Sequence, residues 1–270
     1  MRQIHRKFLD FLESGYDLDN EFQSIIKILF DERIQSNMHE FKSFLHLIVK
    51  VSNNHYRTYN FFNKIEKIII SFKKEMQSYF TNNEIFNIFK SNKRILLFLF
   101  EEKIIHVNEY ILHKILTYKY RHSFYFEYFY NEIKQCLHNY QSRVKKIISL
   151  YIDLEKIPEI IDEKRKIGEN DSKICELIRN DSIIEFIIHV NKTNLPLDSQ
   201  ISPSIYETNN LLLQKHATLI EYAAFFGSIQ IFNYLKANKV QLTPSLWIYS
   251  IHSNNAEMIH LLEVNNVKLP

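Results

Sequence analysis

Twelve histidines are the residues of this sequence best suited to hold a metal ion. His39 and His46 are seven residues apart, as are His106 and His113. In a helix this spacing puts two side chains on one face but about 10 Å apart along the axis. Each ligand atom must lie about 2 Å from a zinc ion, so two side chains this far apart cannot share one ion. The motif His-Glu-x-x-His of helical metalloproteases does not occur. We therefore expect no metal site.

Candidate nucleophiles also lack the neighbours that would activate them. Ser228 follows a glycine, but the second glycine of a nucleophile elbow is missing. Cys136 and Cys175 fall within helical patterns, which favours small buried side chains over reactive thiolates. The carboxylate pairs Glu101–Glu102 and Asp162–Glu163 fall on polar faces. We expect no catalytic residue and no small-molecule substrate, so the protein is not predicted to be an enzyme.

Phosphate-binding loops are excluded by the glycine content. The 270 residues include three glycines, Gly15, Gly168 and Gly227, which lie far apart. Dinucleotide fingerprints, P-loops and kinase glycine-rich loops each need clustered glycines, because the backbone must approach the phosphate closely. We expect no nucleotide and no other cofactor.

Several features predict the compartment. Two well-separated cysteines make neither a disulfide framework nor a cysteine-based zinc site, which fits a reducing environment. The first residues reach Asp10 without forming the apolar core of a signal peptide. The longest apolar run, Ile95–Phe100, is far shorter than the roughly 18 residues of a membrane span. We expect a soluble, cytoplasmic protein without a membrane partner.

The charge distribution leaves one alternative open, a nucleic-acid-associated helical protein. Residues 1–150 hold 23 Lys and Arg against 16 Asp and Glu, whereas residues 151–270 hold 11 against 15. The stretch 114–146 mixes basic and aromatic side chains, a combination that can hold single strands. Its members are Lys114, Lys119, Arg121, Lys134, Arg143, Lys145 and Lys146, with Tyr118, Tyr120, Tyr125 and Tyr128. Glu127 and Glu132 interrupt this stretch. We therefore favour the interpretation that its basic side chains form a solvent-exposed face that covers an aromatic core, and we do not expect nucleic acid as the partner.

The elements that must position any site are predicted to be helices. Apolar residues at helical spacing form one stripe of Phe8, Leu9, Phe11 and Leu12, and another of Phe41, Phe44, Leu45, Ile48 and Val49. Asn37 and Thr81, each followed three residues later by a glutamate, are N-terminal capping signals. The glycine-rich turns of sandwiches and barrels are missing. The sequence therefore predicts an all-α fold.

An internal repeat indicates how the helices are organised. Residues 227–240 align without a gap on residues 254–267, at a step of 27 residues. The matching apolar pairs are Ile231 with Met258, Phe232 with Ile259, Tyr234 with Leu261, Leu235 with Leu262, and Val240 with Val267. Residues 91–104 fit the same frame, and weaker copies begin near Arg121 and Asp181. Each copy reads as an amphipathic helix preceded by a shorter helix. Such hairpins bury their apolar faces by stacking, so we expect a helical-hairpin solenoid.

The segment Thr218–Gly227 resembles an ankyrin repeat. The family pattern Thr-Pro-Leu-His-x-Ala-Ala-x-x-Gly-His is met at Thr218, Ile220, Ala223, Ala224 and Gly227, and not at Leu219, Glu221 and Ser228. In physical terms Thr218 and Glu221 can form a capping box, and Gly227 can supply a tight turn. The following copy keeps Leu246 and Trp247 in the apolar positions.

The resemblance extends beyond that segment. Residues 163–171, 174–182, 203–209 and 219–227 look like large ankyrin-type families of trichomonad protists, in which a helical domain of unknown function precedes degenerate ankyrin repeats. This implies an N-terminal all-helical domain of degenerate hairpins at 1–165 and an ankyrin repeat region at 166–270, with copies near 172–190, 216–240 and 243–268. The implied function is a non-enzymatic scaffold or adaptor whose partner is another protein.

The ankyrin frame also implies a binding surface. In ankyrin stacks the first helix of each pair turns its variable positions toward a concave groove. On this sequence the frame puts Ile220, Ala223 and Ala224 in the core, with Trp247 buried at the position equivalent to Ile220. The residues expected to be exposed and to bind the partner are Tyr222, Phe225, Phe226, Tyr249 and His252. Clustered exposed aromatic residues are typical of interface anchors, although packing against the helical domain would also explain them.

Overall fold

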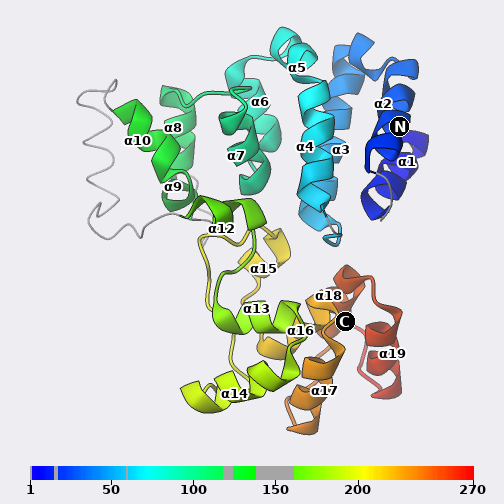
Figure 1. The fold of residues 1–270 in the computed structure, drawn as a ribbon, viewed down its shortest axis with the longest axis vertical. Helices are drawn as coiled ribbons and strands as arrows, with labels where there is room; N and C mark the ends of the chain where they lie inside the picture. The colour runs from blue at the N-terminus through cyan, green and yellow to red at the C-terminus, as the bar shows by residue number, and fades with distance from the viewer. Residues whose placement is uncertain (1, 15–17, 59, 118–123, 138–160) are drawn as a thin grey trace. The chain divides into compact units, whose positions relative to one another are not determined.

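The computed structural model describes residues 2–14, 18–58, 60–117, 124–137 and 161–270 (Figure 1). These residues are all-helical: they contain no β-strand, and a single antiparallel bridge joins Gln200 to Thr218. The all-α prediction is confirmed. The chain divides into two compact units, Met1–Lys166 and Ile167–Pro270, which we call the N-unit and the C-unit.

The N-unit consists of short helices with a largely aromatic and aliphatic core. The helices are α1 (Arg2–Glu13), α2 (Leu18–Asp31), α3 (Met38–Asn54), α4 (Phe61–Ser71), α5 (Lys73–Tyr79), α6 (Asn82–Phe89), α7 (Lys93–Glu101), α8 (Glu109–Thr117), α9 (Tyr125–Tyr128), α10 (Tyr130–Leu137) and α12 (Asp162–Ile167), with a 3-10 turn at Ile34–Ser36. α12 crosses the boundary between the two units by one residue.

The predicted stripes and caps produce these helices. The stripe residues of α3 are all buried, and in α1 Phe8, Phe11 and Leu12 are buried. The side chain of Asn37 accepts hydrogen bonds from the backbone N–H groups of His39 and Glu40 at the start of α3. Thr81 and Glu84 form a capping box on α6. Both capping predictions are confirmed.

Buried charge fastens α12 to the rest of the N-unit. Arg165 is buried, and its guanidinium donates to both carboxylate oxygens of Glu132, at 3.0 and 2.8 Å, and to the carbonyl oxygen of Tyr128 at 3.0 Å. Tyr128 in turn donates its hydroxyl to the carbonyl oxygen of Arg165 at 2.9 Å. Nearby, Arg94 pairs with Glu66 and donates through Nε to the carbonyl oxygen of Lys166 at 2.7 Å. Removing one partner of such a buried pair leaves a charge without compensation, so this network makes α12 an integral part of the N-unit.

The C-unit is a series of helical hairpins. Its helices are α13 (Lys173–Arg179), α14 (Ile183–Thr193), α15 (Asn210–Gln214), α16 (Leu219–Phe226), α17 (Ile229–Ala237), α18 (Leu246–Ser253) and α19 (Ala256–Val264). The pairs α13–α14, α16–α17 and α18–α19 each form a hairpin, and α16 packs against both α13 and α18 (Figure 1). Within each pair the first helix is the shorter, as the repeat predicted.

The 27-residue repeat is also a repeat of backbone hydrogen bonds. The second helix of each hairpin ends with a bond that spans five residues, from Val240 N–H to Leu235 O at 3.1 Å and from Val267 N–H to Leu262 O at 3.0 Å. The residue before each donor, Lys239 or Asn266, has a positive φ. This is the Schellman arrangement, in which an apolar residue follows the left-handed one. The same bond closes α7, where Ile104 N–H donates to Leu99 O at 2.9 Å. Segment 91–104 of the N-unit therefore ends in the same backbone arrangement as the repeat.

Neighbouring hairpins of the C-unit are joined at their turns. Asp181 lies in the turn between α13 and α14, with φ of 48°. Its carboxylate accepts from the N–H groups of Gln230 and Ile231, both at 3.0 Å, in the first turn of α17. A second hydrogen bond joins the same two hairpins, because the Ser228 hydroxyl donates to the carbonyl oxygen of Ile178 at the end of α13. An acidic side chain at a helix N-terminus is favourable, so Asp181 caps a helix of the next hairpin.

Candidate functional site

The five residues expected to form an exposed surface have different environments. Tyr222, Phe225 and Tyr249 are buried, with 1%, 7% and 2% of their surface accessible, whereas Phe226 and His252 are partly exposed. The prediction that Tyr222, Phe225 and Tyr249 are exposed is wrong. The reason is that α16 is covered by neighbouring helices on two sides, so aromatic residues on both of its sides enter the core.

The two buried tyrosines find internal hydrogen-bond partners. Tyr222 accepts through its hydroxyl oxygen from Arg179 Nη1 at 2.9 Å, and Tyr249 donates to the carbonyl oxygen of Lys215 at 3.1 Å. Burial raises the pKa of both phenols. Both rings therefore stabilise the core, because a buried hydroxyl without a partner would be costly.

Four of the five residues nevertheless touch one another, and an arginine extends the set. The Phe225 ring stacks on His252 of α18 at 5.1 Å and meets Phe226 edge-on at 4.9 Å. Phe226 lies 4.8 Å from the Tyr222 ring, and the Arg179 guanidinium of α13 lies 6.0 Å over Phe226. We call Arg179, Phe226, Phe225 and His252 the aromatic row. The row crosses three neighbouring first helices near their C-terminal ends. Tyr249 has no ring contact with it in the described part of the C-unit.

The aromatic row carries little free charge. Arg179 pairs through Nε with Glu169 at 2.8 Å and donates to the carbonyl oxygen of Asn170 at 2.7 Å. Burial lowers the pKa of His252 below its ordinary value of 6.5, so the imidazole is neutral at pH 7. The accessible members of the aromatic row, Phe226 and His252, therefore offer a small aromatic surface at neutral pH. Such a surface suits an apolar or aromatic side chain of a partner better than a charged one.

The sequence reasoning missed Arg179. The one sequence signal for Arg179 was its position at the C-terminal end of a helix in a weak repeat copy. When the two left-handed turn residues Asp181 and Gly227 are superposed, Arg179 aligns with Phe225. The core assignment of Ile220, Ala223 and Ala224 is confirmed, since all three are buried.

Trp247 departs from expectation. It is partly exposed rather than buried, and its indole N–H donates to the carbonyl oxygen of Val267 at 3.0 Å. Ile220, at the equivalent position of α16, lies on a helix with neighbours on two sides, whereas α18 has its helical partners in α16 and α19. Trp247 is exposed because its side of α18 lacks a further hairpin among the described residues.

The basic stretch 114–146 lies only partly within the described chain, because residues 118–123 and 138–146 are outside it. In the described part, Tyr125 and Tyr128 are buried, so their rings are not available to stack on bases. Lys114 lies over the Tyr110 ring at 5.4 Å, and Lys134 over the Tyr130 ring at 6.0 Å. These contacts fit cationic side chains that cover an aromatic core.

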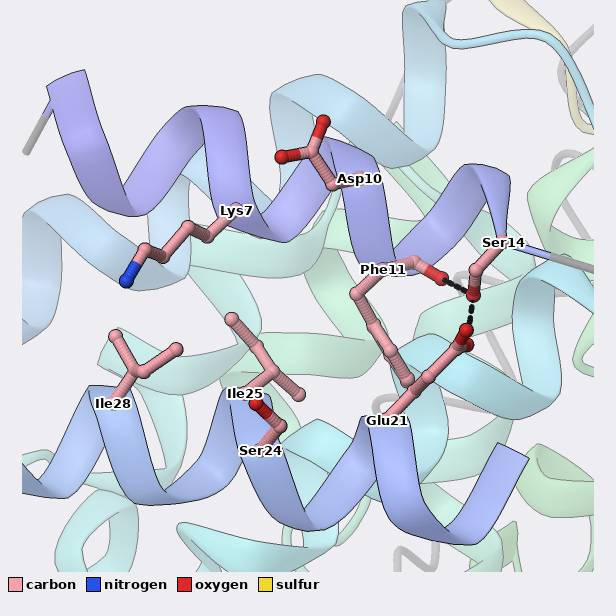
Figure 2. Close-up of a pocket in the computed structure, with 8 residues that line it drawn as sticks. All are labelled: Lys7, Asp10, Phe11, Ser14, Glu21, Ser24, Ile25 and Ile28. Atoms are coloured by element: carbon pink, nitrogen blue, oxygen red, sulfur yellow. Dashed lines mark hydrogen bonds between the residues drawn. The ribbon is translucent and has the colours of Figure 1, made fainter. Parts of the chain in front are cut away.

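A groove of about 380 Å³ lies between α1 and α2 in the N-unit (Figure 2). Its lining residues are Lys7, Asp10, Phe11, Ser14, Glu21, Ser24, Ile25 and Ile28. Figure 2 shows Ser14 and Glu21 facing each other at one end, hydrogen-bonded. Lys64 of α4 donates to Ser14 Oγ at 3.2 Å.

A serine beside a buried lysine is the arrangement of Ser–Lys hydrolases, in which a neutral amine takes the serine proton. Here Lys64 Nζ also donates to the carbonyl oxygens of Phe11, Leu12 and Ser14. Burial lowers the pKa of Lys64, while the Glu21 carboxylate opposes that change. Because the amine donates to three carbonyl oxygens at the end of α1 as well as to Ser14 Oγ, it caps that helix. The Ser14 hydroxyl donates to the carbonyl oxygen of Phe11 and to the Glu21 carboxylate rather than to the amine.

Other chemistry is equally unsupported by local geometry. Cys175 is buried, and burial raises the pKa of its thiol to about 11, which disfavours the thiolate. The Cys136 side chain lies outside the described part of the chain. Within the described ranges, no three His, Cys, Asp or Glu side chains come together as metal ligands. No helix among those residues has the length and apolar character to cross a bilayer.

Comparisons of this chain with known protein families, with curated proteins and with solved structures find no match.

Proposed function

We propose that this protein is a non-enzymatic interaction scaffold of the ankyrin type, which binds another protein at the aromatic row of the C-unit. The observation that carries the proposal is the contact of Phe226 and His252, through Phe225, across neighbouring first helices. In stacked hairpins these helices together form one continuous face, on which a partner can contact several repeats at once. The proposal includes a cytoplasmic location.

The packing beneath the row supports this role. Phe225 is buried between Phe226 and His252, so it holds the two accessible rings in place. Interface hot spots are typically aromatic residues supported by packed neighbours, and pre-ordered rings lose little conformational entropy on binding. Arg179 adds a cation over the Phe226 ring, 6.0 Å from its centroid.

A comparative capture experiment tests the proposal. The wild-type chain, Phe226→Ala and the control Ile184→Ala are immobilised separately and exposed to lysate of the source cell, and the bound proteins are identified by mass spectrometry. Ile184 is a suitable control because it is exposed and lies on α14, away from the row. We expect one set of proteins to bind the wild type and the control, and to be lost from Phe226→Ala. Equal capture by all three would refute the assignment of the row as the binding surface.

A further inference from the structure

His252 is the titratable residue among the accessible members of the aromatic row. Its imidazole is partly exposed and stacks on the buried Phe225 ring at 5.1 Å, with an interplanar angle of 27°. Among the described residues, the imidazole has no hydrogen-bond or ion-pair partner. Arg179, at the other end of the row, pairs with Glu169 at 2.8 Å. The row therefore compensates the charge of its arginine but would leave a charge on its histidine without a partner.

The helices packed against α18 do not supply a partner for such a charge. α18 packs against α16 and α19, and it contains no Lys, Arg, Asp or Glu itself. Glu221 accepts from Thr218 and Ser245 at the first turn of α16, whereas Phe225 and His252 meet near the last turn. The titratable side chains on these three helices besides His252 are Glu221 and Tyr222 on α16, Tyr249 on α18, and Glu257, His260 and Glu263 on α19. Burial is the cause of the lowered pKa of His252, and no charge among the described residues contributes to it.

A charge on His252 is more costly in a complex than in the free chain. In the free chain, burial lowers the pKa of His252 because part of the water that would solvate an imidazolium is excluded. A partner side chain that covers Phe226 and His252 excludes the remaining water and lowers this pKa further. A group whose pKa falls on binding releases its proton on binding, so protonation opposes binding.

We propose that the protonation state of His252 controls binding at the aromatic row, so that the row binds its partner while the imidazole is neutral and releases it when the imidazole is charged. The inference rests on the proposed function and adds to it the regulation of the same site by pH. Histidine changes its charge between about pH 5 and pH 8, whereas ordinary carboxylates change theirs below about pH 5. At a pH below the pKa of His252 in the free chain, the affinity should fall about tenfold for each pH unit, because one proton is exchanged on binding.

Binding measured as a function of pH tests the proposal. The probe is the most abundant protein that the wild type captures from the lysate and that is lost from Phe226→Ala, used in purified form. Isothermal titration calorimetry gives Kd for the wild type, His252→Phe and His260→Gln from about pH 7.5 to about pH 5. His252→Phe keeps an aromatic ring that cannot be charged. His260→Gln is the matched control, because the His260 side chain is 70% exposed and lies on α19, outside the row. Circular dichroism at each pH establishes that the chains are folded.

The result expected is a difference in pH dependence between the two histidine variants. We expect Kd to rise about tenfold over this range for the wild type and His260→Gln, and Kd of His252→Phe to stay nearly constant relative to its own value at neutral pH. A wild-type Kd that does not depend on pH, or the same pH dependence in His252→Phe, would overturn the proposal and leave the row as the binding surface. If no captured protein depends on Phe226, the proposed function itself is wrong and the regulation is refuted with it.

A measurement on the wild type alone tests the physical cause. NMR follows the Hε1 resonance of His252, assigned by its absence from His252→Phe, as the free chain and the complex are titrated. We expect the pKa of His252 to lie below 6.5 in the free chain and lower still in the complex. An equal pKa in the two states would show that the partner does not exclude water from the imidazole, and it would refute the proposal however the variants behave.

Discussion

Gly227, at the turn between α16 and α17, offers the sharpest test of the hairpin geometry. It ends α16 with φ of 69° and ψ of 28°, in the left-handed region. A residue other than glycine costs about 1–2 kcal/mol there, and a β-branched residue is especially poorly suited. The substitution Gly227→Val therefore destabilises the turn through the backbone alone.

A side chain at this position also meets the neighbouring hairpin. A Cβ atom on Gly227 would lie 3.1 Å from Asn255 Nδ2 and 3.3 Å from Asn255 Cβ. Asn255 caps α19 by accepting from the N–H groups of Glu257 and Met258. Displacing such a cap costs about 1 kcal/mol. With the backbone cost, we expect Gly227→Val to lower the free energy of unfolding of the C-unit by about 2–3 kcal/mol.

Tryptophan fluorescence in urea measures this loss. Trp247 is the single tryptophan of the chain and lies in the C-unit, so its emission reports the unfolding of that unit. With a urea dependence of about 1–2 kcal/mol per molar, the midpoint should fall by about 1–3 M. Gly227→Asn is the control, because asparagine tolerates the left-handed region and already occupies it at Asn254. An unchanged midpoint for the valine variant would refute the turn assignment, and equal losses for valine and asparagine would show that the backbone term is unimportant.

Three further outcomes follow from the structure. Asp181→Ala removes the cap that joins two hairpins and should lower the stability of the C-unit by about 1 kcal/mol, measured by the Trp247 fluorescence midpoint in urea. Burial holds the pKa of His252 below 6.5 in the folded state, so its contribution to stability is present above pH 6.5 and is lost as the pH falls; a His252→Gln variant should lose less stability between neutral and mildly acidic pH in thermal melts, and parallel curves would contradict this. The lysine side chain of Arg165→Lys cannot make the two-oxygen contact with Glu132, so this variant should lower the free energy of unfolding of the N-unit by about 2–4 kcal/mol, measured by circular dichroism in urea. A variant that unfolds at the same urea concentration as the wild type would show that the buried network is not needed for stability.

Local sequence signals were sufficient for the helices and their ends. The side chains of Asn37, Thr81 and Thr218 cap the helices that they were predicted to cap, because a cap depends on residues within one turn of it. The 27-residue repeat correctly identified α16–α17 and α18–α19 as hairpins, and φ of 69° at Gly227 agrees with the turn predicted there.

The candidate site was only partly predictable. Helical spacing assigns residues to faces of a helix, and by this measure Tyr222 and Phe225 fall on different sides of α16 from the predicted core residues. The number of neighbours that a helix acquires does not follow from its own sequence. α16 has α13 on one side and α18 on the other, so most of its residues are buried, including residues on different faces of the helix.

The comparison of α16 with α18 separates what the sequence determines from what the tertiary structure decides. The sequence by itself determined that both are short helices, where α16 begins and ends, and which positions correspond at a step of 27 residues. Only the tertiary structure decided that Ala224 is buried and that Ile251, at the equivalent position, is exposed. The physical reason is that helix formation is governed by contacts within a turn, whereas burial is a non-local property set by whether another hairpin packs against that face.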